Sequence, residues 1–179
     1  MVDYLKIKEI ADASGFTHIG DLNAELIEVR TEVRDMCAVN TCKEYGTNWS
    51  CPPGCGTLSQ CEEKIRKYKN GLILQTTGAL EDSYDYEAML DIKKIHDKAI
   101  SKFAKAIAPL YPEAMVLGAG SCMICKKCTY PDRPCSFPDK MISSMEAYGI
   151  VVNDICKANN IPYNYGPNTL TYVGCVLID

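Results

Sequence analysis

Cysteine is the residue type whose number and spacing carry the most chemical information in this chain. The segment CMICKKCTYPDRPC places four thiols within fourteen residues, at Cys122, Cys125, Cys128 and Cys135. The first three follow the C-x2-C-x2-C spacing with which a bacterial ferredoxin loop supplies thiolates to a [4Fe–4S] cluster. The gap to Cys135 is longer than in that pattern, so the spacing leaves open whether Cys135 completes the same cluster or reaches toward another.

Structural zinc is the alternative for this segment. Zinc sites usually combine two separate C-x2-C pairs, so that one tetrahedral ion meets two thiolates from each. In this segment the third cysteine comes only three residues after the second, which suits that arrangement less well. The spacing therefore favours a [4Fe–4S] cluster over zinc.

A second group of thiols lies earlier in the chain, in CAVNTCKEYGTNWSCPPGCGTLSQC, residues 37–61. Its five cysteines are Cys37, Cys42, Cys51, Cys55 and Cys61. They are enough for another four-thiolate site with one thiol left over, and their spacing alone does not separate zinc from a cluster. The prolines and glycines of SCPPGCG predict a stiff turn whose backbone N–H groups could point at cluster sulfurs.

Composition narrows the class of protein. The 179 residues are 47% hydrophobic and 23% charged, which is typical of one globular domain spanning residues 1–179. The net charge of −4 argues against a nucleic-acid partner or an anionic membrane surface. The N-terminal segment carries charged residues throughout and lacks the apolar core of a signal peptide, so we expect a cytoplasmic protein. In a reducing compartment, eleven cysteines favour metal binding or redox chemistry over disulfides.

The elements that must position these thiols follow from hydrophobic periodicity and turn residues. Helices are predicted at 3–15, 58–68, 84–110 and within 144–160, and strands at 16–22, 71–77 and 114–120, with a closing hairpin of 161–166 and 169–179. The residues expected to face the core are Leu5, Ile7 and Ile10 in the first helix, and Ile92, Ile95, Ala99, Phe103, Ile107 and Leu110 in the longest.

Strands that alternate with helices predict an α/β or α+β fold with a mixed sheet flanked by helices. The first cysteine segment, rich in turn residues, is expected to lack regular structure. The second begins at the carboxyl end of the strand at 114–120, a position at which such folds often carry their functional loops.

Three stretches resemble a known family: RDMCAVNTCKEYGTNWSCPP, GAGSCMICKKCTYPDRPCSFPDKMISSMEAYGIVV and the C-terminal TYVGCVLID. They are similar to the domain-of-unknown-function family numbered 2284, described as predicted metal-binding proteins. The resemblance implies one ligand group of Cys37, Cys42 and Cys51, and another of Cys122, Cys125, Cys128 and Cys135. It also implies relatives in anaerobic bacteria and archaea, which suits oxygen-labile clusters, and it brings no reaction with it.

Three functional hypotheses remain. The first is an electron-transfer protein or redox accessory with two [4Fe–4S] clusters and a redox partner protein that the sequence does not identify. The second is an enzyme in which a cluster held by three cysteines keeps an open iron as a Lewis acid, with Cys55 or Cys61 as a reactive thiol. The third is an interaction module stabilised by zinc. We expect no ligand role for His18 or His96, and the oligomeric state is left open.

Overall fold

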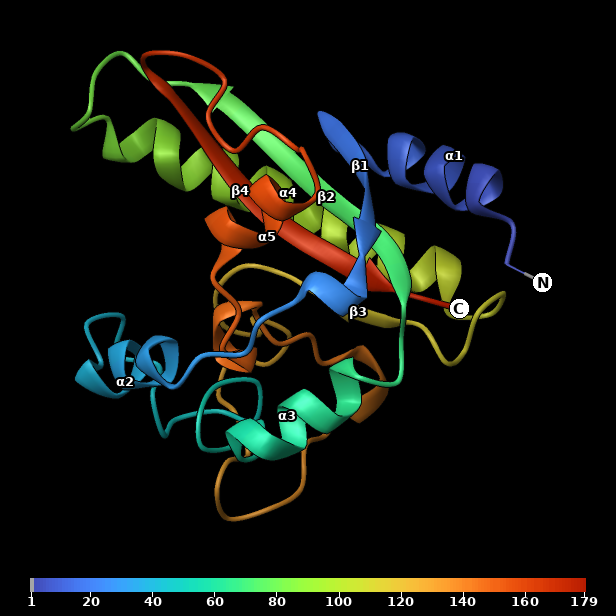
Figure 1. The fold of residues 1–179 in the computed structure, drawn as a ribbon. Helices are drawn as coiled ribbons and strands as arrows, with labels where there is room; N and C mark the ends of the chain where they lie inside the picture. Colours follow the sequence, from blue (N-terminus) through green and yellow to red (C-terminus); the bar gives the residue numbers. More distant parts are fainter. Residues whose placement is uncertain (1) are drawn as a thin grey trace.

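The fold is built on a four-stranded antiparallel sheet (Figure 1). The computed structural model describes residues 2–179. The strands are β1 (His18–Asn23), β2 (Asn70–Ala79), β3 (Met115–Leu117) and β4 (Thr169–Leu177). They lie in the order β1-β2-β4-β3. The long pair of β2 and β4 aligns Ile73 with Cys175, and the short β3 aligns Leu117 with the same cysteine on the other side of β4.

The fold is α+β, the second of the two predicted classes, and the expected mixed sheet is corrected to an antiparallel one. The strand–helix–strand passage from β2 to β3 does give two strands that run in the same direction. However, β4 lies between them and is antiparallel to both. The C-terminal strand thereby removes the parallel pairing that the chain order suggested.

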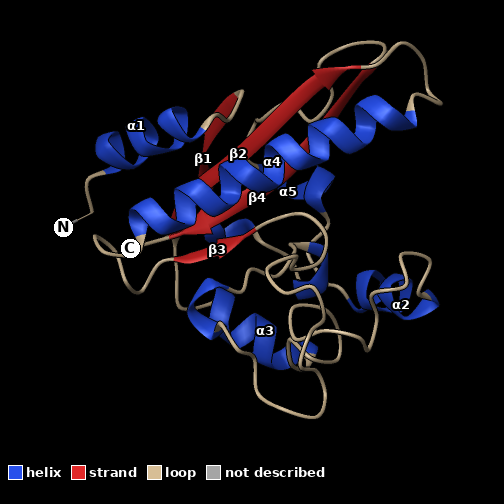
Figure 2. Ribbon diagram, turned by 180° about the vertical axis from the view of Figure 1, so that it is seen from behind, coloured by secondary structure: helices blue, strands red, loops and turns tan. Residues whose placement is uncertain are grey.

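Two helices cover one face of the sheet, α1 (Tyr4–Ser14) and α4 (Tyr86–Ile107), as Figure 2 shows. Asp3 and Asp85 cap them, each accepting a hydrogen bond from a backbone N–H of the first turn. The core on this face is formed by the apolar residues of both helices together with alternate residues of β2 and β4: Ile7, Ala11, Leu72, Leu74, Ala99, Ile100, Phe103, Ile107 and Val176.

The predicted inward faces of these helices need three corrections. Leu5 is 71% exposed, Ile95 is 54% exposed and Leu110 is 45% exposed, whereas His96 is fully buried. The buried stripe of α4 passes through Ile92, His96, Ala99 and Phe103, so it is centred one residue beyond Ile95. A histidine therefore occupies a core position that the apolar pattern assigned to an isoleucine.

A second core lies on the opposite face of the sheet. It brings together α3 (Leu58–Ile65), α5 (Val152–Ala158) and the short 3₁₀ helices η1 (Ala24–Leu26) and η3 (Glu146–Tyr148). Cys55, Cys61, Cys156 and Cys175 are among its buried residues. Cys156 and Cys175 are both fully buried free thiols outside the two cysteine segments.

The cysteine segments lie at one end of the molecule, beside α3 and α2 (Thr31–Val39), and below the sheet in Figure 1. The first segment is less irregular than expected, because Cys37 lies in α2 and Cys61 lies in α3. The second follows the end of β3, as predicted, and the short 3₁₀ helix η2 (Pro138–Lys140) comes after its last cysteine.

The predicted closing hairpin is wrong in its first half, because residues 161–166 form no strand. Side chains hold this segment instead. Gln75 Nε2 donates to the carbonyl of Pro162, and the Tyr165 hydroxyl donates to Gln75 Oε1 over 2.5 Å. Pro162 has no N–H with which to pair in a ladder.

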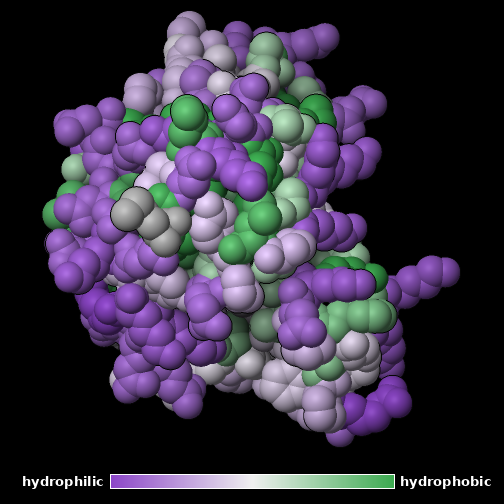
Figure 3. All heavy atoms as spheres, turned by 90° about the vertical axis from the view of Figure 1, so that its right-hand side faces the viewer, coloured by the Kyte–Doolittle hydropathy of each residue, from purple (hydrophilic) through white to green (hydrophobic). Residues whose placement is uncertain are grey.

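None of the helices found between residues 2 and 179 is both long enough and apolar enough to cross a membrane. On the face drawn in Figure 3, hydrophilic side chains surround small, separate groups of hydrophobic ones.

Candidate metal centre

The base of the second cysteine loop is closed by backbone hydrogen bonds. Gly118 N donates to Ser143 O, and Met145 N donates to Gly118 O. Gly118 and Ser144 form a bridge of parallel sense at this point. The loop that carries Cys122 through Cys135 is therefore anchored at both ends to the edge of the sheet.

A second backbone junction holds the first cysteine segment against the residues that follow the loop. Val29 forms an antiparallel bridge with Ile150, and Arg30 N donates to Gly149 O over 2.8 Å. Gly149 has φ +78°, and a Cβ there would lie 2.6 Å from Leu58 Cδ1 and 3.1 Å from the Arg30 carbonyl oxygen. Only glycine allows α2 and α3 to approach this strongly turned backbone.

The two cysteine loops also contact each other directly. The backbone N–H of Cys122 donates to Ser50 Oγ over 2.9 Å, and Ser50 Oγ in turn donates to Asn48 Oδ1 over 2.7 Å. Trp49 Nε1 donates to the Arg133 carbonyl over 3.0 Å, and its ring meets Tyr130 edge-on. Cys122 is thus hydrogen-bonded to Ser50, the residue that directly precedes Cys51.

All eleven cysteines are free thiols. In the first loop, Cys37 is half-buried, Cys42 is exposed and Cys51 is buried. Burial raises the pKa of Cys37 and of Cys51, and the charge of Cys42 raises both further. Asn48 and Ser50 act in the opposite direction on Cys51, because their hydrogen bonds favour its thiolate. These three thiols therefore share one electrostatic neighbourhood.

In the second loop all four thiols are half-buried. Burial raises the pKa of Cys122, while backbone N–H groups of Ile124 and Ile142 favour its thiolate. Cys135 and Cys125 also act on this thiol by charge repulsion, with Cys135 the stronger. The charges of Cys135 and Cys125 therefore both act on the thiol of Cys122 within the same loop.

Cys55 and Cys61 are arranged differently from the other seven. Both belong to the core, with exposed fractions of 6% and 0%. The guanidinium of Arg34 lies between them, with Nη1 3.7 Å from the sulfur of Cys55 and Nη2 3.7 Å from that of Cys61. A hydrogen bond between the two thiols lowers the pKa of Cys61 to about 7, and the same bond and burial raise the pKa of Cys55. The two thiols together therefore lose one proton easily, whereas the second proton is held strongly.

The donor set is thiolate sulfur, a ligand that both zinc and iron–sulfur clusters take. Among residues 2–179, no three His, Cys, Asp or Glu side chains converge closely enough to hold a single metal ion.

Two features of the site were missed by sequence reasoning. The Asn48–Ser50 pair was unremarkable in a turn, although an Asn three residues before a Cys can accept its backbone N–H, as Asn48 Oδ1 does from Cys51. Glu146 gave no signal at all. It lies in η3, where burial raises its carboxyl pKa against the opposing hydrogen bond from Ser144 and the charge of Lys93, and it acts on the pKa of Cys37.

Comparison with known families matches residues 20–178 to the family described as "Predicted metal-binding protein (DUF2284)". The chain belongs to this family. The match covers both cysteine loops and all of the sheet except the first two residues of β1, and it confirms the resemblance seen in the three sequence stretches. No curated protein and no solved structure matches the chain.

Membership of DUF2284 and the free cysteines together support a metal cofactor. The family description names no metal and no reaction. The nine predicted ligands of the two loops are all free thiols, and two of them, Cys55 and Cys61, contact Arg34.

Proposed function

We propose that the protein binds two [4Fe–4S] clusters and acts in electron transfer or as a redox accessory. Cys122, Cys125, Cys128 and Cys135 would hold one cluster, and Cys37, Cys42 and Cys51 would hold the other. When bound, such clusters exchange single electrons at potentials set by their ligands, charge and hydrogen bonds.

The observation that carries this proposal is the contact between the two cysteine loops at one end of the molecule. The Cys122 N–H bond to Ser50 and the Trp49 bond to Arg133 hold the loops together. Two redox centres on adjacent loops would be near each other, and the exposed or half-buried state of six of the seven thiols would keep them near the surface. Both conditions favour electron exchange with a partner protein.

The charges around the second loop are consistent with such a partner. Lys126, Lys127 and Arg133 are exposed on this loop. Cationic side chains beside a thiolate-bound cluster offset its negative charge, and they would attract an acidic surface on a redox partner.

Protein purified without oxygen tests the proposal. We expect about eight iron and eight acid-labile sulfide per chain, and an EPR signal after reduction. Cys125→Ser should lower the iron and sulfide content, whereas the matched control Cys156→Ser, at a buried thiol outside both loops, should leave it unchanged. A colourless protein with stoichiometric zinc and no sulfide would reject the proposal.

A second candidate is an enzyme in which the cluster of the first loop is a Lewis acid. The engagement of Cys55 and Cys61 with Arg34 favours it, because three thiols then remain for four irons. An iron with an open position can polarise a bound substrate. Cyanide added to the reduced protein should shift the EPR signal of that cluster alone, and an unchanged spectrum would contradict an open iron.

A further inference from the structure

The paired thiols of Cys55 and Cys61 lie outside the set assigned to the clusters. Cys55 precedes the capping residue Thr57, and Cys61 lies within α3, so the turn into the helix brings them together. Each thiol is also close to a backbone carbonyl, Cys55 to that of Ala147 and Cys61 to that of Cys55. These contacts hold both sulfurs beside the same guanidinium.

Arg34 is partly buried beside this pair of thiols. Its Nη2 donates to the Gly56 carbonyl over 2.5 Å, and its Nε is buried without a hydrogen-bond partner in the described part of the chain. A partly buried cation needs a counter-charge. One thiolate shared between Cys55 and Cys61 supplies it, which gives this dithiol the electropositive setting typical of reactive cysteines.

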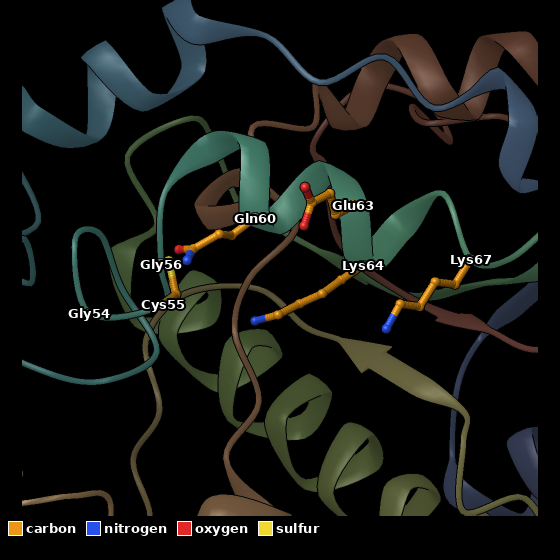
Figure 4. Close-up of a pocket in the computed structure, with 7 residues that line it drawn as sticks. All are labelled: Gly54, Cys55, Gly56, Gln60, Glu63, Lys64 and Lys67. Atoms are coloured by element: carbon orange, nitrogen blue, oxygen red, sulfur yellow. The ribbon is translucent and has the colours of Figure 1, made fainter.

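A cavity of about 430 Å³ opens onto one member of the pair. Its lining is Gly54, Cys55, Gly56, Gln60, Glu63, Lys64 and Lys67. Figure 4 shows Cys55 at one end of this pocket, Lys67 at the other and the amine of Lys64 between them. Cys61 is not part of the lining and is fully buried, so the pocket gives access to Cys55 and not to its partner.

We propose that Cys55 and Cys61 form a redox-active dithiol that reacts with small anionic disulfides bound in this pocket. Lys64 and Lys67 carry two positive charges against the single negative charge of Glu63, and Arg34 adds a third behind the sulfurs. The pocket therefore favours a carboxylate-bearing disulfide over a neutral or cationic one.

The reaction balances as two thiol–disulfide exchanges that start from the pair with one thiol and one thiolate. Cys55 passes its proton to Cys61, attacks one sulfur of the substrate disulfide, breaks that S–S bond and releases the first substrate thiolate. Cys61 then gives its proton to this thiolate and attacks the sulfur of Cys55, which forms the Cys55–Cys61 disulfide and releases the second thiolate, protonated by water. The protein loses two electrons and one proton, and the substrate gains two electrons and two protons, one of them from water.

This inference does not depend on the identity of the metal. Its first test uses the metal-loaded protein, incubated without oxygen with glutathione disulfide, a carboxylate-bearing probe. After the remaining thiols have been alkylated, chymotrypsin can cleave after Leu58, between the two cysteines. We expect a disulfide that joins the resulting peptides, while the buried thiols of Cys156 and Cys175 remain reduced.

Single variants separate the two roles. Cys61→Ser should stop at a stable glutathione adduct on Cys55, and Cys55→Ser should leave Cys61 unmodified because that thiol has no access to the pocket. Both variants should keep the metal content of the parent protein. Loss of metal in either would instead make that cysteine a metal ligand and overturn the inference, while leaving the two-cluster proposal in place.

The charge of the pocket is tested by comparing disulfides. Lys67→Gln should slow the reaction with glutathione disulfide by up to about fivefold, since an exposed charge contributes at most about 1 kcal/mol. The rate with 2-hydroxyethyl disulfide, a neutral probe, should not change. Equal slowing with both probes, or no Cys55–Cys61 disulfide in the parent protein, would refute the proposed site.

Discussion

The buried histidine of α4 makes the stability of this protein depend on pH in a way that can be measured. His96 is fully buried between Phe16 and Tyr172, and its Nδ1 is hydrogen-bonded to Thr76 Oγ1 over 2.9 Å. Its Nε2 has no partner in the described chain. Burial, with a smaller contribution from the charge of Lys93, lowers the pKa of His96 from 6.5 to about 3.

The sign follows from proton counting. Between pH 6.5 and pH 3 the unfolded chain binds a proton at this histidine and the folded chain does not, so the free energy of unfolding decreases as the pH falls. At 1.36 kcal/mol per pH unit, the full effect is at most about 5 kcal/mol, and it is complete near pH 3. Above pH 7 the histidine is neutral in both states and contributes no pH dependence.

We expect His96→Gln to flatten this part of the pH profile, because glutamine can still bond to Thr76 but does not titrate. Urea unfolding at a series of pH values measures the difference between parent and variant, which removes the contribution of every other group. The matched control is His18→Gln at the other histidine of the chain. Parallel profiles for parent and His96→Gln between pH 7 and pH 4 would refute the argument, as would titration of the His96 ring near pH 6.5 by NMR.

Three further predictions concern the contacts that hold the cysteine loops. Ser50→Ala removes the acceptor of the Cys122 N–H, so it should cost about 1–3 kcal/mol and speed iron release to a chelator; unchanged release would contradict the link between the loops. Gly149→Ala forces a Cβ to within 2.6 Å of Leu58 Cδ1 in a left-handed residue and should lower the free energy of unfolding by about 2 kcal/mol or more; a neutral result in urea unfolding would show that α3 can move aside. Thr57→Ala removes a helix cap and should cost about 1 kcal/mol by thermal unfolding, with Thr57→Ser recovering most of it; equal losses in both variants would point away from capping.

The elements with a strong periodic signal could be predicted from the sequence. The long helix and the apolar strand at 71–77 are both present in the structure. Their hydrophobic patterns are long enough to identify each element from the sequence. The error at Ile95 arose because a helix buries a stripe, and a polar His96 within that stripe carries no hydrophobic signal. The error at 161–166 arose because a long-range partner, Gln75, determines the conformation of that segment.

The candidate site, too, could be predicted from the sequence only in part. Spacing was enough to group the four cysteines of the second loop, because local chain geometry limits where they can lie. The separation of Cys55 and Cys61 from the first loop could not be predicted in this way. It depends on Arg34, which lies 21 residues before Cys55 and reaches both sulfurs only after α2 and α3 have packed against η3.

The closed base of the second loop has a consequence for how the protein is assembled. Joining the ends of a flexible loop of about 25 residues costs roughly 3 kcal/mol of chain entropy. Here hydrogen bonds at the edge of the sheet offset that entropy loss, because Gly118 pairs with Ser143 and Met145 directly after β3, which itself pairs with β4. The base of this loop is therefore closed by backbone hydrogen bonds that involve no metal ligand. In this respect the protein differs from zinc fingers, in which the ion itself must drive folding.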